Sequence, residues 1–525
     1  MAADTAQGFD LEERFKQAAS TGMQIAVWAE LKPNKVAIYD YTGQDRTWGE
    51  MNANANRIAR RLREAGIGKG DAAAILVSNR AEFCDAMFGC LRAGVRFTPV
   101  NWHLTPEEIA YIVNDCEAKA LFADVRVKEA AEEAAKTCAN LKVKIAVGGP
   151  IPGFEDFESL KKHDGSNIDN PIAGYSMLYT SGTTGRPKGV HKPTAVYGAF
   201  AQDVDRDNDR HLCTGPAYHA APLAGDVRGA LSNGLTIVFV DKWDSEQVLA
   251  LIDQYKITHS HMVAIMFQRL LSLPEDVKAK YDISSLKRVR HGAAPCPPEV
   301  KHAMIRWLGP IIGEYYAGSE GGAGFTITSE EWLTKPGSVG KRPPGDLAKI
   351  CDEKGSEVGP NVVGQIWMKQ PSGITFTYYK DDKKTLDNRL GDHFTLGDYG
   401  YFDDDGYLFL TGRSAETIIA GGVNIYPQEI DNELIKHPAV EDSCTIGIPH
   451  DQYGEEVRAV IQLKPGIEKS DEVRQSILKF ANEKLAKYKV PRGLDFIDEL
   501  PRNQAGKALR QKVRAPYWAG RTRQI

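Results

Sequence analysis

Residues 179–190 combine residue types that suit the binding of a phosphate chain. They read Tyr-Thr-Ser-Gly-Thr-Thr-Gly-Arg-Pro-Lys-Gly-Val, with three glycines, four aliphatic hydroxyls and one lysine, Lys188. Glycine lets backbone N–H groups approach an anion, hydroxyls can rotate onto phosphate oxygens, and Lys188 adds a positive charge. The lysine spacing differs from that of the GxxxxGK[ST] nucleotide loop. A flexible surface loop is the alternative for a segment of this composition.

Further downstream, five short motifs carry potential ligand groups. They are His-Gly-Ala-Ala-Pro-Cys-Pro at 291–297, Glu-Tyr-Tyr-Ala-Gly-Ser-Glu at 314–320, Leu-Gly-Asp-Tyr-Gly at 396–400, Ala-Gly-Gly-Val-Asn-Ile-Tyr-Pro at 420–427 and Leu-Pro-Arg-Asn-Gln-Ala-Gly-Lys at 500–507. Each one alone has a structural explanation: a tight turn, a surface charge, a hairpin, a mobile turn and a solvated basic tail. Their common order along the chain is therefore more informative than any single motif.

Residues 179–190 match, residue for residue, the signature of the adenylate-forming superfamily, which includes acyl-CoA synthetases, luciferases and peptide-synthetase adenylation domains. The five later motifs follow in the family's order, and the chain resembles the acid:CoA ligase branch from about residue 25 to about residue 515. The resemblance implies three small-molecule partners: ATP, Mg²⁺ and coenzyme A. It assigns the ATP phosphates to Lys188 together with Thr180, Ser181, Gly182, Thr183, Thr184 and Gly185.

The resemblance also implies a set of residues for the rest of the nucleotide. Tyr316 would stack on adenine, Ser319 would contact the α-phosphate, and Glu320 would hold Mg²⁺, which prefers hard carboxylate oxygens. Asp398 would accept hydrogen bonds from the ribose hydroxyls, with Arg413 as the second ribose contact. The adenine edge would be formed by Gly292, Ala293 and Ala294, and Glu314 and Tyr315, from the same motif as Tyr316, also belong to the expected nucleotide-binding set. Ala317 and Ser319 replace the family's usual Gly and Thr, and they retain the small size and the hydroxyl.

For the reaction itself, the resemblance implies that Lys507 is the adenylation lysine and that Gly421 and Gly422 enter the site for thioester formation. The hinge position two residues after Arg413 is Ala415, where the family usually has Asp or Lys, and a hinge needs torsional freedom more than a particular side chain. Lysines that some plant ligases carry near the glycine loop are absent. His219, in Pro-Ala-Tyr-His at 216–219, corresponds to a segment at the acyl pocket, and a structural hydrogen-bonding role is its alternative.

The expected chemistry has two half-reactions. The substrate carboxylate, already ionised at neutral pH, attacks the α-phosphate of ATP, and the thiol of CoA then displaces AMP. Fatty, aromatic and steroid-like acids remain open, with fatty-acid or lipid metabolism as the expected setting; the segment 218–222 has no acidic residue to pair with an amino-acid ammonium group. The alternatives are an adenylating enzyme that loads a carrier protein, a luciferase-like oxygenase and a catalytically silent nucleotide-binding or scaffold protein.

Short apolar runs and helical patterns alternate through the first four hundred residues. Strands are predicted at 72–78, 236–240, 257–263, 288–292 and 312–316, with a helix at 80–93 and a capping box at 105–108. The fold class is α/β, with layered subdomains and a small β-structure, followed by a small mobile α+β domain. The predicted boundaries are a core at 1–412, a hinge at 413–416 and a C-terminal domain at 417–525 that carries Lys507.

Composition excludes several classes of protein. The chain has 525 residues and a net charge of −5, which gives no basic footprint for nucleic acid. It has no basic start followed by an apolar run, and no uninterrupted apolar stretch long enough to span a bilayer. The eight cysteines form no CxxC pair, so a zinc site or disulfide framework is not expected. A cytoplasmic protein is the expectation, and a homodimer is left open.

Overall fold

The computed structural model describes residues 2–180, 187–192, 200–413, 416–420, 423–450, 453–503 and 506–519. The chain forms two compact units. The first unit comprises Met1–His261, Leu273–Val289 and Ile374–Thr385, and the second comprises Met262–Ser272, Arg290–Gly373 and Leu386–Ile525. No helix within these described ranges is long and apolar enough to cross a membrane.

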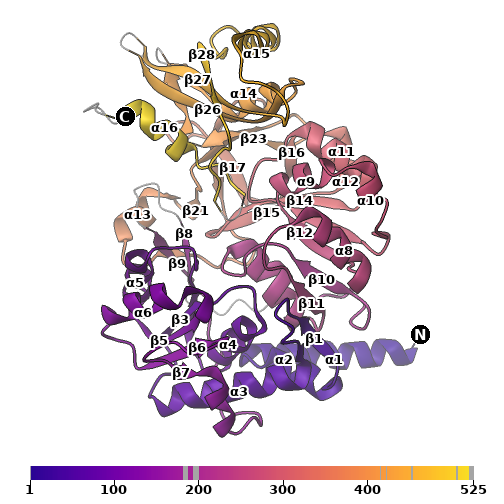
Figure 1. Cartoon of the computed structure of the whole chain (residues 1–525), viewed down its shortest axis with the longest axis vertical. Helices are drawn as coiled ribbons and strands as arrows, with labels where there is room; N and C mark the ends of the chain where they lie inside the picture. The colour runs from indigo at the N-terminus through magenta and orange to yellow at the C-terminus, as the bar shows by residue number, and fades with distance from the viewer. Residues whose placement is uncertain are drawn as a thin grey trace. The chain divides into compact units, whose positions relative to one another are not determined.

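A parallel sheet in the first unit has helices on both faces, as the predicted alternation of strands and helices requires (Figure 1). Its order is β4 (Arg96–Pro99), β3 (Ala72–Leu76), β5 (Ala118–Asp124), β6 (Val143–Val147) and β7 (Glu155–Asp156). Alternate residues of β3 enter two different cores, Ala73 and Ile75 on one face and Ala74 and Leu76 on the other. Such two-sided burial is typical of parallel sheets.

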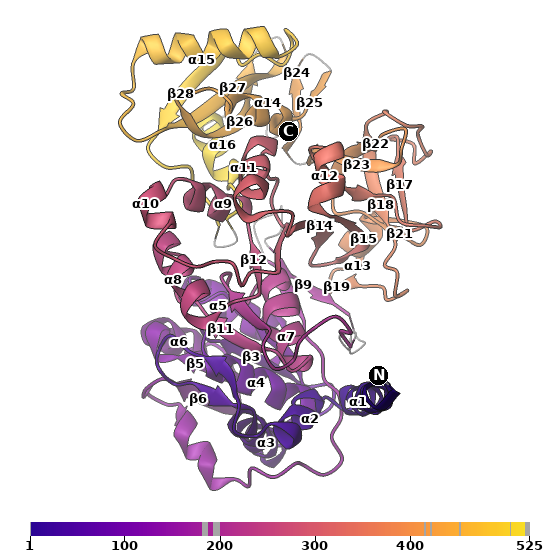
Figure 2. The same cartoon turned by 90° about the vertical axis from the view of Figure 1, so that its right-hand side faces the viewer.

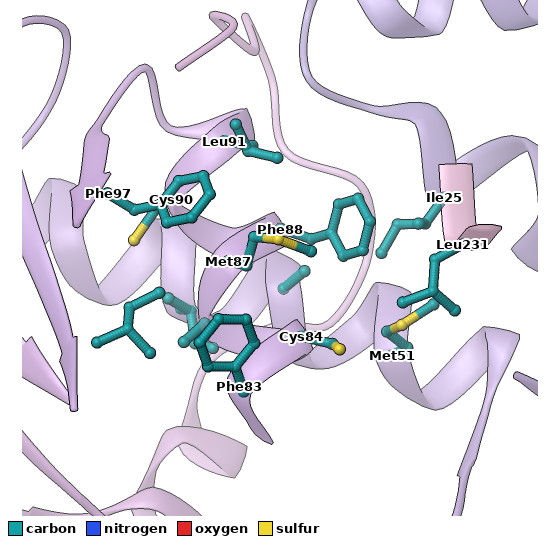
Figure 3. Packing of buried hydrophobic residues seen from close by; sticks show 14 of the residues in the cluster. Ile25, Met51, Phe83, Cys84, Met87, Phe88, Cys90, Leu91, Phe97 and Leu231 are labelled. Carbon is teal, nitrogen blue, oxygen red and sulfur yellow. The ribbon is translucent and has the colours of Figure 1, made fainter. Parts of the chain in front are cut away.

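The first face of this sheet is covered by α3 (Trp48–Glu64) and α4 (Ala81–Arg92), and the second by α5 (Pro106–Asp115) and α6 (Lys128–Lys136). The predicted helix at 80–93 is confirmed as α4, all of whose residues are buried. Figure 3 shows Phe83, Met87 and Phe88 of α4 in the same apolar cluster as Met51 of α3, which lies beside Leu231. The predicted capping box is also confirmed, because Thr105 accepts a hydrogen bond from the backbone N–H of Glu108.

The remaining strands of the first unit form two further groups. Strands β2 (Arg46–Thr47), β1 (Val36–Tyr39), β11 (Thr236–Phe239), β10 (Arg210–Cys213) and β12 (His259–Met262) lie next to one another in that order. Between β10 and β11 the chain forms a π-helix, Pro222–Gly229, which continues into α7 (Ala230–Ser232). A small antiparallel sheet joins β8 (Leu178–Thr180), β9 (Lys188–His191) and β19 (Thr377–Tyr378). Strands β8 and β9 therefore flank the predicted phosphate loop.

The second unit contains the hairpin of β14 (Ile312–Gly318) and β15 (Gly321–Ile327), preceded by α9 (Ala264–Leu271) and α11 (Pro298–Leu308). A largely antiparallel sheet follows and includes β16 (Ser338–Lys341), β18 (Gly364–Met368), β22 (Asp398–Phe402) and β23 (Tyr407–Arg413). The backbone N–H of Gly406 donates to the carbonyl of Asp403 at 3.0 Å and closes the turn between β22 and β23.

The last hundred residues form a sheet with helices on both faces, shown at the top of Figure 2. Strands β26 (Val440–His450) and β27 (Gly454–Leu463) pair along their whole length, and β24 (Ile418–Ala420), β25 (Val423–Ile425) and β28 (Gly493–Ile497) complete the sheet. Helices α14 (Pro427–Leu434) and α15 (Asp471–Lys484) pack on one face. Helix α16 (Arg510–Trp518) packs on the other, through Val513. The layered α/β class predicted from the sequence is therefore confirmed.

Candidate nucleotide site

A cavity of about 210 Å³ in the second unit gathers residues from motifs that lie far apart in the sequence. The predicted site residues on its wall come from the motifs at 291–297, 314–320, 396–400 and 500–507 and from Arg413 at the end of β23. They are Gly292, Ala293, Ala294, Glu314, Tyr315, Tyr316, Asp398, Arg413 and Lys507. The fold therefore places the residues assigned to adenine, ribose and the tail lysine around one space.

Asp398 is the centre of a hydrogen-bonded group on this wall. It begins β22, directly opposite Arg413 on β23. The Tyr316 hydroxyl donates to Asp398 Oδ2 at 2.7 Å, and Arg413 Nε donates to Asp398 Oδ1 at 2.7 Å. Burial, and next the Asp398 charge, raise the pKa of Tyr316 well above its usual value, so that the hydroxyl stays a donor. Each carboxylate oxygen can accept a further hydrogen bond, which leaves room for a ligand hydroxyl.

The adenine-edge segment follows β13 (Arg288–His291) and has little side-chain volume for a steric reason. A Cβ atom on Gly292 would lie 2.6 Å from the ring of Tyr315, closer than any real contact allows. Ala293 has a φ of +65°, in the left-handed region where larger and branched side chains are strained. The backbone of this segment is consequently exposed to the cavity, as the binding of a flat base edge requires.

Behind the cavity wall lies a buried ion pair that no sequence motif indicated. Lys301 on α11 is fully buried, and its Nζ donates to Glu314 Oε2 at 2.6 Å. His291 Nε2 is 3.4 Å from the same oxygen. Burial raises the pKa of Glu314 and lowers that of Lys301, while their mutual attraction opposes both shifts. The sequence signal was available, because Lys301 shares a helical face with Met304 and Ile305, where an apolar residue is expected.

Lys507 is presented by a tight turn in which Arg502 and Ala508 form a β-bridge. Within the turn, the backbone N–H of Lys507 donates to Asn503 Oδ1 at 2.9 Å. Gly506 has a φ of +74°, and a Cβ atom there would lie 2.7 Å from Ile265 Cγ2, so two constraints favour glycine. Burial, and next the charge of Arg413, lower the pKa of Lys507.

Glu416 is a second partner of the tail that the sequence did not reveal. Its Oε1 is 4.0 Å from Lys507 Nζ, and its Oε2 accepts a hydrogen bond from Arg510 Nε at 3.2 Å. Arg510 also donates to Asp431 Oδ2 at 3.0 Å. The lysine thus lies within ion-pair distance of a carboxylate that is itself fixed by an arginine.

Lys188 belongs to the first unit. It lies on β9 opposite Thr180 of β8 and forms an ion pair with Asp381. This pair lowers the pKa of Asp381 and gives the lysine a structural partner that the motif did not indicate. The loop residues between these strands, Ser181, Gly182, Thr183, Thr184 and Gly185, lie outside the described residues.

Comparison with known proteins identifies the family. The model of the AMP-binding enzymes matches residues 25–379, and the model of the AMP-binding enzyme C-terminal domain matches residues 429–507. The chain belongs to the AMP-binding enzymes of the adenylate-forming superfamily. Its class is that of the acid–thiol ligases, for which ATP and CoA are substrates.

Several curated relatives of this AMP-binding enzyme match it over most of its length. The fatty acid–[acyl-carrier-protein] ligase ScoC of Streptomyces coeruleorubidus is 30% identical over 92% of this chain and 94% of its own. The 2-succinylbenzoate–CoA ligase of Bacillus licheniformis is 30% identical over 92% of this chain and 98% of its own. The crystal structure of the anthranilate CoA ligase AuaEII in complex with anthranoyl-AMP has a TM-score of 0.86 over 95% and 97% of the two chains; at 24% identity it shows the fold alone.

Two predicted phosphate-site residues of this AMP-binding enzyme, Ser319 and Glu320, form the turn between β14 and β15 and are not among the residues that line the cavity. Gln370 Nε2 donates to the Glu320 backbone carbonyl at 2.7 Å and fixes the turn. The described residues contain no group of three His, Cys, Asp or Glu side chains that could hold a metal ion. One carboxylate fits Mg²⁺, which commonly takes one or two protein carboxylates and completes its shell with substrate phosphates and water.

The first unit also contains His219, half-buried at the start of the helical segment that holds the π-helix. Its ring centroid lies 4.9 Å from that of Tyr218, and burial lowers the pKa of His219 to about 4. The ring is therefore neutral at pH 7. The residues predicted to contact CoA, Gly421 and Gly422, and the hinge residue Ala415 lie outside the described residues.

Proposed function

We propose that this enzyme is an ATP-dependent acid:CoA ligase that forms an acyl-adenylate and then an acyl-CoA, releasing pyrophosphate and AMP. The observation that carries the proposal is the position of Lys507 on the wall of the cavity that also contains Asp398, Arg413 and the adenine-edge segment. A tail lysine needed only for solubility would have no reason to lie half-buried beside these groups.

In the first half-reaction the residues position ATP and neutralise charge. Gly292, Ala293 and Ala294 hold the base edge, Tyr316 stacks on it, and the Asp398–Arg413 pair holds the ribose. Lys507 donates to the oxygens of the carboxylate and the α-phosphate, where negative charge must be tolerated as the two groups meet. Lys188, Thr180, Ser319 and the loop at 181–185 contact the phosphates. Glu320 would hold Mg²⁺, which supplies further neutralisation of phosphate charge when bound.

In the second half-reaction we propose that residues 417–525 rotate about a hinge at 413–416, relative to a core at 1–412. Lys507 then leaves the cavity, and Gly421 and Gly422 approach the pantetheine arm of CoA. The contacts of Glu416 with Lys507 and Arg510 hold the first arrangement together, and they must break or move with the domain during this rotation. The thiol attacks the acyl carbonyl, and AMP leaves with the bonding electron pair.

A carrier protein is the second candidate acceptor. One observation favours it: a relative that matches 92% of this chain is a fatty acid–[acyl-carrier-protein] ligase. Other relatives over similar lengths act with CoA on indoleacetate or long-chain fatty acids. The acid of this enzyme therefore belongs to a broad carboxylic class, fatty, aromatic or steroid-like. His219 orients it, and a cytoplasmic location and a homodimer complete the proposal.

The test separates the two steps. Acid-dependent ATP–pyrophosphate exchange measures adenylation, and AMP release with free CoA or with a phosphopantetheinylated carrier protein measures transfer. Gly422→Leu is expected to retain exchange and to lose CoA-dependent AMP release. Ligase activity would be contradicted if no acid of a broad panel supports exchange. Transfer to the carrier protein but not to free CoA would establish the alternative acceptor. Equal loss of both steps in Gly422→Leu would contradict the domain rotation.

A further inference from the structure

The helical segment after His219 exposes one unusual face. Residues 219–221, 224–225 and 228–229 are accessible, whereas Leu223, Asp226 and Val227 between them are buried. These accessible groups recur every four to five residues along the chain, a longer period than the 3.6 residues of an α-helix. The π-helix over Pro222–Gly229 accounts for this period, and the N–H of Ala230 donates to the carbonyl five residues earlier, at Gly225.

The π geometry places Arg228 on the same face as His219. Nine residues make two and a half turns of an α-helix and would put the two side chains on opposite sides. Here the first turn is α-helical, with the N–H of Leu223 donating to the His219 carbonyl, and the wider π turns over Pro222–Gly229 follow. The longer period keeps residues 219–221, 224–225 and 228–229 on one accessible side, which includes both His219 and Arg228. Gly229 permits this geometry, because its Cβ position is only 2.5 Å from the Ala224 carbonyl oxygen.

The side chains between these two polar residues are small. Ala220, Ala221, Ala224 and Gly225 occupy the face, and a Cβ atom on Gly225 would meet nothing within 4 Å. Next to His219, Tyr218 is 7% exposed, and its hydroxyl has no hydrogen-bond partner within the described residues. An elongated molecule on this face would therefore meet open space in the middle and polar groups at both ends.

Arg228 has no counter-charge in the described part of the chain. It is half-buried, burial lowers its pKa, and neither an ion pair nor a hydrogen bond to its side chain is found there. The nearest acidic residue of the same helix, Asp226, is buried on the other face, 3.4 Å from His211 Nδ1. The undescribed stretches closest in sequence, 181–186 and 193–199, contain no Asp or Glu. A guanidinium in protein surroundings normally has an anionic partner.

We propose that Arg228 binds a second carboxylate on the acid substrate, so that this enzyme selects dicarboxylic acids. The inference rests on the proposed function and makes it more specific. The guanidinium fork matches a carboxylate with two parallel hydrogen bonds, and the small residues before it accommodate the chain or ring that joins the two acid groups. Arg228 determines specificity in this scheme, because it binds the carboxylate of the diacid that does not react with ATP.

The test compares matched acids that differ by one carboxylate: octanoate with octanedioate, and 3-phenylpropanoate with its para-carboxylated analogue. Wild-type enzyme is expected to show a kcat/KM in ATP–pyrophosphate exchange at least about 100-fold higher for the diacid of the preferred pair. Arg228→Leu removes this preference, and Arg228→Lys retains part of it. KM for ATP and CoA stays unchanged, which excludes a phosphate as the partner of Arg228. Arg288→Leu, at an exposed arginine of the same unit, is the matched control.

Two results would overturn the inference: wild-type preference for the monoacids, or an unchanged diacid preference in Arg228→Leu. Exchange with monoacids alone leaves the ligase proposal intact and refutes only the role of Arg228. If no acid supports exchange, the ligase proposal fails, and calorimetric titration of both acid classes into wild type and Arg228→Leu still decides whether the guanidinium binds a carboxylate.

Discussion

The nucleotide cavity of the second unit and the π-helix face of the first unit differ in whether their charged side chains have partners within the protein. In the cavity, Asp398 is bonded to Tyr316 and Arg413, and Lys301 is paired with Glu314. On the helix face, Arg228 has no partner among the described residues, and His219 is neutral.

This difference follows from what each region has to recognise. The nucleotide is the same for every AMP-binding enzyme, so its polar contacts can be fixed in advance by pairs within the protein, which lowers the cost of reorganisation during the reaction. The acids named for the relatives differ from one to the next. A group that recognises a variable ligand is left without a protein partner, because the ligand supplies the opposite charge.

The largest effect is expected in the cavity, at Lys507. Lys507→Ala should lower acid-dependent ATP–pyrophosphate exchange by at least about 10²- to 10³-fold, the usual consequence of losing one well-placed donor. Transfer to CoA from a supplied acyl-adenylate should change little, since the lysine leaves the site for that step. Lys512→Ala, at an exposed position of α16, is the control. Normal exchange in Lys507→Ala would remove the proposed role of this residue.

The free energy of unfolding should respond differently to the removal of a paired charge, Lys301, and of one without a partner among the described residues, Arg228. Lys301→Met leaves Glu314 buried without its partner and should destabilise the protein by about 3 kcal/mol. The double variant Lys301→Met/Glu314→Gln should recover part of this loss. Arg228→Met removes a charge that no described residue compensates, and it should be neutral or stabilising by about 1 kcal/mol. Denaturant unfolding measures both, and a loss of several kcal/mol in Arg228→Met would mean that a protein partner exists.

The same contrast decides what the sequence could reveal. Asp398 and Tyr316 lie in motifs that the chain shares with its family, and the same resemblance assigned Arg413 to the ribose. The fold gathers all three around one cavity. Lys301, Glu416 and Arg510 carry no motif, since their roles arise from partners that only the folded chain brings near. The face shared by His219 and Arg228 could not be predicted from the sequence for another reason. A π-helix has no simple sequence signature, and an α-helical reading places Arg228 on the opposite side.

A smaller effect on ATP binding is expected at Asp398, whose carboxylate already accepts hydrogen bonds from Tyr316 and Arg413. Asp398→Asn replaces one acceptor oxygen with a donor, which confronts the Tyr316 hydroxyl or Arg413 Nε with an N–H group. KM for ATP should rise about 10-fold or more, while KM for the acid changes little. Tyr316→Phe should have a weaker effect, because one acceptor site on Asp398 is then free for ribose. Asp387→Asn, at the exposed end of α13 (Asp382–Asp387), is the matched control. Equal rises in both KM values would contradict a ribose role.

The smallest effect concerns the pH response of the helix face. Burial lowers the pKa of His219 to about 4, against about 6.5 in an unfolded chain, so the unfolded state binds the proton more readily between these values. The stability that neutral His219 contributes is complete above pH 6.5 and is lost as the pH falls toward 4, by about 1 kcal/mol once solvent screening is allowed for. Subtracting the profile of His219→Gln from that of wild type isolates this term. A flat difference would mean that His219 titrates normally, and below pH 6.5 the charged ring would then compete with Arg228 for the second carboxylate.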